Sequence, residues 1–359
     1  MQNRIIASII IPTYDRRETL AAALSALERQ EGCDFAFEVI VVDDGSRDAT
    51  AEMVEQTAAT VSYPLRCVRV SRCGPGLARN RGVEAAAGDA VLFTDSDCVP
   101  RPGWVAALVR AVQEADGPVG GPTAVPARAS WSARCVNAIM NSRLGGLGRQ
   151  WRLLGLWAGY RLRTCNAGLS REQFNAVGGF SSVCGFYGED IELSERLSRR
   201  FGQPRRCENA VVEHRENRHL RDYVREAAAK GICTGRLVRK RRLKLKGVYL
   251  VPTLLIALAI GGALLPLWHR GLALACGGLL AAYLAVVLAY GVAFAVTERR
   301  LANVLLLPLT AVLIHVSFGL GFPAGLLGRR IPVKESRGPA RPTDPSPCIL
   351  PDTETNRAG

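Results

Sequence analysis

The chain has 359 residues, of which 48% are hydrophobic and 22% charged, and its formal net charge is +14. This length allows one large domain or two smaller ones. The 11 cysteines include no C-x-x-C pair, which disfavours a zinc site or a disulfide framework and favours reduced thiols. The first residues lack the pattern of a cleaved signal peptide, and we expect none.

The first half of the chain alternates short apolar runs with helical patterns. Apolar runs at 7–13, 38–44, 65–71 and 90–97 predict four strands, and helices are expected around 20–27, 48–58 and 77–87. Strands that are apolar on both faces and alternate with helices indicate a mostly parallel sheet covered by helices on both sides. The sequence therefore predicts an α/β fold, in which ligands bind beyond the carboxyl ends of the strands.

The middle of the chain is less regular. Residues 118–163 are rich in Gly, Trp and Arg and could hold a mobile loop. A helix is expected from Glu189, because helical spacing follows it and acids fill its first turn. A short strand at 210–214 and a helix at 220–231 come next.

Charge and hydropathy then point to a membrane. The densest basic block, RLVRKRRLKLK at 236–246, directly precedes apolar runs at 248–268, 272–296 and 301–327. Such charge could also serve nucleic-acid binding, but basic residues beside apolar spans are more typical of the cytoplasmic side of a membrane. Each run is long enough to span, since a span takes about 20 residues. The third run leaves both a span and a re-entrant or interfacial segment open, because a full span would put the basic residues after it outside.

Two acids, Asp95 and Asp97, end the fourth apolar run in FTDSDCVP. A D-x-D pair at a strand end can aim both carboxylates into one crevice, and Mg²⁺ or Mn²⁺ takes such oxygen ligands together with phosphate. Two like charges this close raise one pKa unless a positive charge compensates. Taken alone, however, a solvated acidic turn is the more common explanation.

The other motifs are also ambiguous in isolation. VVDDGS at 41–46 is ordinary turn chemistry, although an acid there could bind a nucleobase or ribose. GPGLARN at 74–80 is a poor dinucleotide fingerprint, although Arg79 could lie near a diphosphate. The acids that follow GFYG suit a helix start and could include a general base. His214 could be a metal ligand or a polar strand end.

Taken in order, SIIIPTYD, VVDDGS, ARNRGVEAAAGDAVLFTDSD and GGFSS…GFYGEDIELSERL resemble the family 2 glycosyltransferases, which have the GT-A fold. The resemblance covers residues 7–214. It implies transfer of a sugar from a nucleotide-sugar donor with inversion at the anomeric carbon, assisted by a divalent cation, Mg²⁺ or Mn²⁺.

The resemblance also implies roles for individual residues. Asp190 would be the catalytic base, Asp97 would hold the metal, and His214 is a further candidate ligand. The remaining positions fall into two groups: the nucleotide sugar would contact Pro12, Thr13, Tyr14, Asp44, Arg79, Asp95 and Ser96, and the sugar and acceptor pocket would include Asn166, Gly168 and Glu189.

Processive polysaccharide synthases of this family carry a Q-x-x-R-W motif after the acidic element, and nothing after Asp190 matches it. We therefore predict a non-processive, membrane-anchored glycosyltransferase whose acceptor is a lipid-linked glycan or a polyprenyl phosphate, with no nucleic-acid partner. A processive synthase and a catalytically inactive membrane scaffold that binds nucleotide are the alternatives.

The predicted domains follow from these assignments. A GT-A domain over 1–246, which ends in the basic juxtamembrane segment, faces the cytoplasm. A multi-pass membrane domain with two or three spans follows over 247–328, and a disordered tail follows over 329–359.

Overall fold

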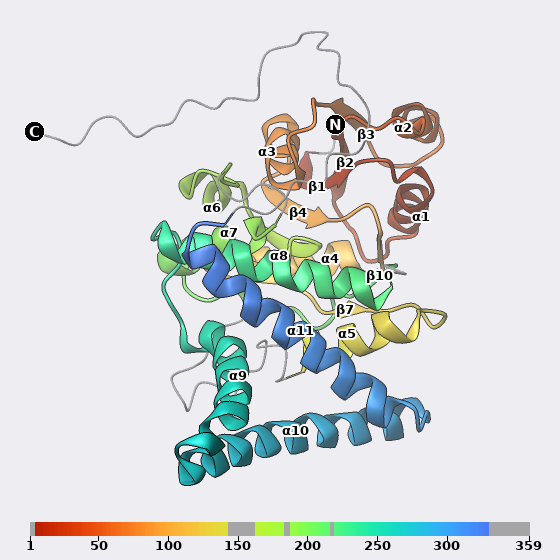
Figure 1. The fold of residues 1–359 in the computed structure, drawn as a ribbon. Helices are drawn as coiled ribbons and strands as arrows, with labels where there is room; N and C mark the ends of the chain where they lie inside the picture. Colours follow the sequence, from red (N-terminus) through yellow and green to blue (C-terminus); the bar gives the residue numbers. More distant parts are fainter. Residues whose placement is uncertain (1–3, 143–161, 183–186, 216–218, 330–359) are drawn as a thin grey trace, which may run out of the picture.

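The computed structural model describes residues 4–142, 162–182, 187–215 and 219–329. An α/β domain sits on a group of long helices formed by the last third of the chain (Figure 1). The predicted disordered tail and the centre of the segment expected to hold a mobile loop lie outside the described residues.

The centre of the α/β domain is a seven-stranded sheet with the order β3-β2-β1-β4-β8-β6-β9. Strands β1 to β4 run parallel, whereas β8 runs antiparallel to both β4 and β6, so the predicted mostly parallel sheet is present. The strands are β1 (Ile5–Thr13), β2 (Ala36–Asp43), β3 (Leu65–Arg69), β4 (Ala90–Thr94), β6 (Val119–Gly120), β8 (Asn166–Ser170) and β9 (Arg205–Arg206).

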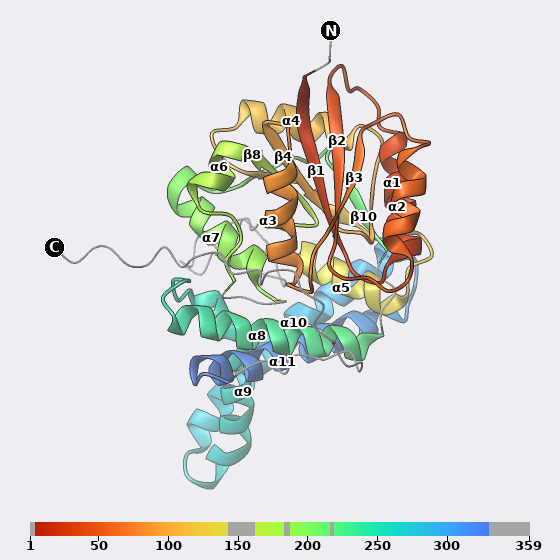
Figure 2. The ribbon, with the colours of Figure 1, turned by 90° about the horizontal axis from the view of Figure 1, so that it is seen from above.

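Helices cover both faces of this sheet because successive strand residues point to opposite sides. On β1, Ile9 and Ile11 join one core cluster and Ile10 joins another. The first face is covered by α1 (Arg17–Glu28), α2 (Thr50–Ala58) and α4 (Trp104–Glu114), and the second by α3 (Pro75–Ala85), α6 (Arg171–Ala176) and α7 (Glu189–Phe201). Figure 2 shows α1 and α2 apart from α3, α6 and α7, with strands between them.

A second, smaller sheet was not predicted. Its order is β5-β10-β7, formed by β5 (Cys98–Pro100), β10 (Val212–His214) and β7 (Thr123–Ala124). The strand predicted at 90–97 ends at Thr94, and Asp95 and Asp97 lie in the turn between β4 and β5. Both acids are held at the carboxyl end of the central strand β4.

Four helices complete the described chain: α8 (Leu220–Arg239), α9 (Gly247–Leu264), α10 (Arg270–Glu298) and α11 (Asn303–Leu326). The last three are long and apolar enough to cross a membrane by length and composition. Glycines let α8 and α11 lie directly against each other (Figures 1 and 2). A Cβ on Gly235 of α8 would lie 2.2 Å from the Phe322 carbonyl oxygen of α11, so only glycine permits this approach.

The α/β domain also holds α11 and α10 through α5 (Trp131–Asn141), a helix in the segment expected to be irregular. Cys135 and Ile139 of α5 pack in one cluster with Leu307 and Ala311 of α11. At one end of this contact, Arg134 forms an ion pair with Glu298, the last residue of α10. Both α5 and α8 thus connect the catalytic half of the chain to the apolar helices.

Candidate active site

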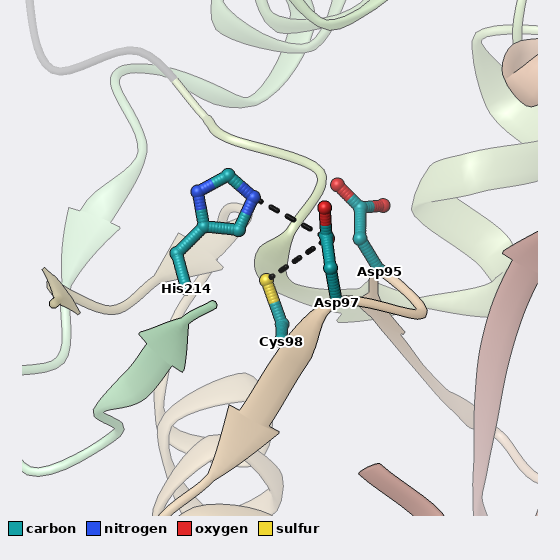
Figure 3. A group of neighbouring side chains, drawn as sticks. All are labelled: Asp95, Asp97, Cys98 and His214. Atoms are coloured by element: carbon teal, nitrogen blue, oxygen red, sulfur yellow. Dashed lines mark hydrogen bonds and ion pairs between the residues drawn. The ribbon is translucent and has the colours of Figure 1, made fainter. Parts of the chain in front are cut away.

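The acidic turn after β4 meets β10 at one edge of the small sheet. Antiparallel pairing of β10 with β5 sets His214 opposite Cys98, directly after Asp97. Figure 3 shows the His214 ring and the Cys98 thiol directed toward the Asp97 carboxylate, with Asp95 beside it. The structure therefore brings together Asp95, which the resemblance placed at the nucleotide sugar, and Asp97 and His214, which it placed at the metal.

Asp97 is buried, with 5% of its surface exposed, and its two oxygens have different partners. Oδ1 lies 3.3 Å from His214 Nε2, and Oδ2 forms an ion pair with Arg16. Burial opposes the charged carboxylate, but the hydrogen bond and charge of His214 and the charge of Arg16 outweigh it, so the pKa of Asp97 is well below its usual range. Asp97 is thus an anion at neutral pH.

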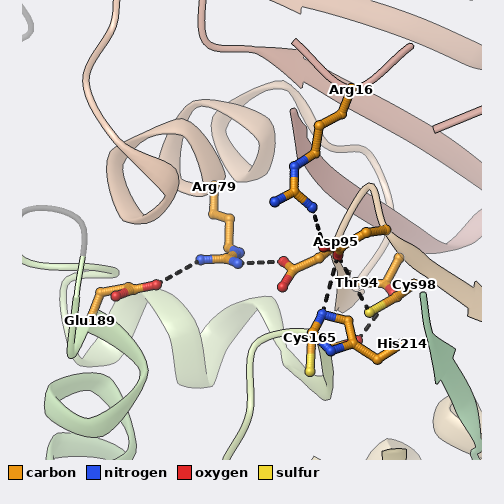
Figure 4. Close-up of polar contacts among 9 residues, drawn as sticks. Arg16, Arg79, Thr94, Asp95, Cys98, Cys165, Glu189 and His214 are labelled. Carbon is orange, nitrogen blue, oxygen red and sulfur yellow. Dashed lines mark hydrogen bonds and ion pairs between the residues drawn. The ribbon is translucent and has the colours of Figure 1, made fainter. Parts of the chain in front are cut away.

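Asp95 forms an ion pair with a different arginine, Arg79 of α3, which is 2% exposed. Arg79 Nη2 lies 2.6 Å from Asp95 Oδ1, and its Nη1 lies 3.5 Å from Glu189 Oε1, so one guanidinium links the turn after β4 to the start of α7 (Figure 4). Arg79 was expected near a diphosphate. The structure shows it buried in contact with two carboxylates, and its role at the donor stays a prediction.

Glu189 and Asp190 begin α7, and their environments differ. Burial, reinforced by the charge of Asp190 and opposed by Arg79, raises the pKa of Glu189 to about 7. Asp190 is partly exposed, and its Oδ1 accepts a hydrogen bond from the Ile191 backbone N–H at 2.8 Å. Gly76 permits this placement, since a Cβ there would lie 3.3 Å from Glu189 Cβ.

The residues expected at the nucleotide lie at the carboxyl ends of β1, β2 and β4. Asp44 accepts backbone hydrogen bonds from Cys73 at 2.7 Å and Gly74 at 2.9 Å, so it holds the loop that enters α3. Burial raises the pKa of Asp44 even though both hydrogen bonds lower it. Tyr14 lies under the Arg72 guanidinium, whose carbon is 4.2 Å from the ring centroid. The end of β1 also holds Pro12 and Thr13, and the turn after β4 holds Ser96. All three are buried.

Asn166 and Gly168, which were expected in the sugar and acceptor pocket, are packed in the core of the domain. Asn166 is fully buried and accepts a hydrogen bond from Trp104 Nε1 at 2.9 Å, and its Nδ2 donates to the Pro122 and Ala210 carbonyls. A Cβ on Gly168 would lie 3.0 Å from Leu92 and Val112 side chains, inside the core. Asn166 therefore ties β8 to α4 and to the segment before β10.

Sequence reasoning missed three residues of the site: Arg16, Cys98 and Cys165. Arg16 stands three residues beyond the end of β1, at the same edge of the sheet as the acids, and this position was the available signal. The Cys98 thiol contacts Asp97, and Cys165 lies beside Cys98 (Figure 4). No local pattern links Cys165 to the acidic turn, because the two meet only through the pairing of β8 with β4.

The chemistry of this group suits a divalent cation. Asp95, Asp97, Cys98 and His214 each offer one ligand atom, and these four atoms all lie within 4.8 Å of one another. Carboxylate, imidazole and thiolate are all common ligands of divalent metals in proteins.

Comparison with known proteins agrees with this geometry. Residues 8–167 match the model of the glycosyl transferase family 2. These residues are a family 2 glycosyltransferase domain. The glycosyltransferase domain has the predicted GT-A fold, and the chain superposes on the mannosyltransferase PcManGT from Pyrobaculum calidifontis, solved with GDP-Man and Mn²⁺, with a TM-score of 0.56, 19% identity, and coverage of 92% of this chain and 89% of that one.

Two curated relatives are similar to part of this chain. The uncharacterized glycosyltransferase YfnE of Bacillus subtilis (strain 168) is 41% identical over 106 residues, which are 29% of this chain and 26% of YfnE. The undecaprenyl-phosphate 4-deoxy-4-formamido-L-arabinose transferase of Pseudomonas syringae pv. syringae (strain B728a) is 33% identical over 115 residues, which are 32% of this chain and 34% of that protein. The match thus spans about a third or less of the length of these two relatives.

Proposed function

We propose that this protein is an inverting, non-processive glycosyltransferase that moves a sugar from a nucleotide sugar to a membrane-associated acceptor. One observation supports a membrane-bound acceptor. Helix α7, which begins with Glu189 and Asp190, packs on α8, and α8 packs on the apolar helix α11. Cys233 of α8 donates to the Tyr187 carbonyl at 2.8 Å, and Lys246 lies 3.0 Å from Glu195 of α7. The catalytic end of the sheet is thus one helix away from the apolar helices.

The donor half of the proposed site is the acidic turn after β4. Asp97 and His214, with Asp95 beside them, would hold a divalent cation, Mg²⁺ or Mn²⁺. The chemistry supplied by a cation held there would be positive charge that stabilises the leaving diphosphate, so that no proton from the protein is needed. Arg79 fixes Asp95, and Arg16 fixes Asp97, so both carboxylates are oriented before the donor arrives.

The acceptor half is the start of α7. Asp190 is partly exposed and would accept the proton of an attacking hydroxyl, which is the role of a general base. Glu189 is held by Arg79 and its side chain is 12% exposed, so it would orient this helix start. If the acceptor is a phosphate, it is already largely ionised near neutral pH, because the second pKa of a phosphate is about 6. Asp190 would then orient the acceptor more than deprotonate it.

The acceptor class is inferred from the membrane helices together with one relative. The Pseudomonas protein described above acts, by its name, on undecaprenyl phosphate, a membrane lipid. The basic block at 236–246 runs from the last turn of α8 to the residue before α9 and suits an anionic headgroup surface. A lipid-linked glycan or a polyprenyl phosphate fits both features.

We also propose that α9 and α10 cross the membrane and that α11 lies along its cytoplasmic face. The first half of α11 packs on α5, and its last turns pack on α8, where Gly325 meets the Ile232 carbonyl. Both α5 and α8 precede the first apolar helix, and α8 carries charged residues on several turns, which hydrocarbon would not accept. Both ends of α11 therefore lie on the side of the catalytic domain.

A screen of the purified full-length protein tests the proposed reaction. The protein is incubated in detergent with individual nucleotide sugars, Mn²⁺ and a membrane-lipid extract. The masses of the lipids are then measured by mass spectrometry. We expect one donor to add the mass of a single sugar to a lipid, and Asp190→Asn to reduce that product strongly. Addition of many sugars to one acceptor would favour a processive synthase. Nucleotide binding without transfer to any acceptor would favour the inactive scaffold.

A further inference from the structure

Cys98 adds a sulfur atom to the oxygen and nitrogen ligands of the candidate metal site. The Cys98 thiol donates a hydrogen bond to Asp97 Oδ1 over 3.9 Å, and His214 Nε2 lies 3.3 Å from the same oxygen. Figure 3 shows both side chains directed at this carboxylate from two neighbouring strands of the small sheet, β5 and β10. Three donor atoms of different chemistry therefore converge on one point.

The partners of Asp97 explain why the convergence occurs at Oδ1. Arg16 occupies Oδ2, so this oxygen faces away from the thiol and the imidazole and is already neutralised. Oδ1 keeps its remaining lone pairs for the side where Cys98 and His214 lie. The site is closed on the Cys98 side, since Cys98 is 0% exposed, and open on the side of the partly exposed Asp95 and His214.

We infer that Cys98 is a direct ligand of the cation in this site, and that the site consequently binds Zn²⁺ or Co²⁺ more tightly than Mg²⁺ or Mn²⁺. Thiolate and imidazole ligands suit Zn²⁺, whereas carboxylates and water suit Mg²⁺ and Mn²⁺. For one ligand set, affinity also rises from Mn²⁺ to Co²⁺. The inference rests on the proposed function, which places a cation at Asp97, and adds both a ligand and a metal preference.

Binding involves no change of oxidation state. The sulfur–metal bond forms as the thiol proton leaves to solvent, so one proton is released for each cation bound through Cys98. Zn²⁺ at low concentration would then displace Mn²⁺ from the donor site. An inhibition by Zn²⁺ that depends on Cys98 follows directly from this competition.

Cobalt reports the ligand directly, because a sulfur-to-cobalt bond gives an intense near-ultraviolet charge-transfer band that oxygen and nitrogen ligands do not give. We expect the full-length protein in detergent to show this band with one equivalent of Co²⁺ and to lose it when Zn²⁺ is added. Cys98→Ser should remove the band. Cys67→Ser is the matched control, because Cys67 lies on β3 at the far edge of the sheet, and it should keep the band.

Two results would overturn the inference. A band of full intensity in Cys98→Ser would assign the sulfur to another cysteine, and bound Co²⁺ without a band in the wild type would exclude sulfur. If Mn²⁺-dependent nucleotide binding persists in either case, the proposed function stands while the inference fails. If no divalent cation affects nucleotide binding, the placement of the cation itself is wrong.

If Cys98→Ser does not fold, X-ray absorption of the zinc-loaded wild-type protein tests whether a sulfur atom is bound to the metal. We expect a sulfur neighbour at about 2.3 Å from zinc. Only oxygen and nitrogen neighbours at about 2.0–2.2 Å would overturn the inference.

Discussion

At the scale of single residues, two arginines compensate the acidic pair. Asp97 is paired with Arg16, and Asp95 with Arg79. The sequence predicted that two carboxylates in D-x-D need a positive charge, because like charges at this spacing raise a pKa. The sequence could not predict which basic residues pair with the acids. Both arginines lie more than ten residues away in the chain, and only the folding of the sheet brings them to the acids.

Removing Arg79 should destabilise the fold. Arg79→Met leaves Asp95 and Glu189 facing each other without a cation, and breaking a buried pair in this way costs about 3–5 kcal/mol. We expect the thermal unfolding midpoint in detergent to fall by several degrees. Arg79→Lys is the control: it keeps the charge and should cost less. An Arg79→Met protein as stable as the wild type would show that Arg79 does not hold α3 to α7.

Glu189 should make stability depend on pH below neutrality. Its folded-state pKa is raised to about 7, whereas an unfolded Glu titrates near 4.3. The folded protein therefore binds this proton more tightly, and its contribution to the free energy of unfolding is full below about pH 4.3 and is lost as pH rises to about 7. Glu189→Gln should flatten this slope, as followed by thermal unfolding at several pH values, and Glu55→Gln at an exposed position of α2 should not. An unchanged slope in Glu189→Gln would place the titrating group elsewhere.

At the scale of elements, local patterns predicted the long strands and helices, and of the strands in the small sheet they predicted only β10. Continuous apolar runs predicted β1 to β4, and helical spacing predicted α1, α7 and α8, because these patterns depend only on residues close together in the sequence. The strands of the small sheet have two or three residues each. Non-local pairing forms them, so no local pattern indicated β5 or β7, and the position of His214 opposite Cys98 could not be predicted from the sequence.

The contact between α8 and α11 also depends on non-local packing, and one substitution tests it. Gly235→Ala would bring a Cβ to 2.2 Å from the Phe322 carbonyl oxygen, so the helices must separate. Overpacking of this kind costs about 1–3 kcal/mol. We expect a lower unfolding midpoint and weaker transfer activity, because α7 rests on α8.

Gly278→Ala in α10 is the control for that substitution, because a Cβ at Gly278 meets no described atom within 4 Å. It adds the same methyl group to an apolar helix without a clash and should leave the midpoint unchanged or raise it. Equal effects of the two substitutions would mean that α8 and α11 do not pack as described.

At the scale of the whole molecule, the catalytic domain and the apolar helices form one connected body. The division at residue 246 remains a prediction, and the contacts of α5 and α8 with α11 imply that removing residues after it would expose an apolar surface. Lengths and hydropathy predicted three candidate spans, but the side on which each helix end lies depends on tertiary contacts. The ion pair of Arg134 with Glu298 places the end of α10 on the catalytic side.

The topology proposed here predicts a cytoplasmic carboxyl terminus. A reporter fused after Gly359 should read cytoplasmic, since α9 leaves the catalytic side, α10 returns to it and α11 stays along it. This arrangement also keeps the basic residues after α11 on the positive-inside face. A reporter fused between α9 and α10 should read external as the matched control. An external signal after Gly359 would instead require α11 to cross the membrane.

The central claim is the division of roles between the turn after β4 and the start of α7, and paired measurements of donor binding and turnover test it most directly. Asp97→Ala should weaken Mn²⁺-dependent binding of the nucleotide sugar, because it removes a ligand of the cation at the diphosphate. Asp190→Asn should leave donor binding nearly intact and lower turnover by about 10²–10⁴-fold for a hydroxyl acceptor, and by clearly less for a phosphate acceptor. Loss of donor binding in Asp190→Asn, with unchanged binding and turnover in Asp97→Ala, would contradict this account.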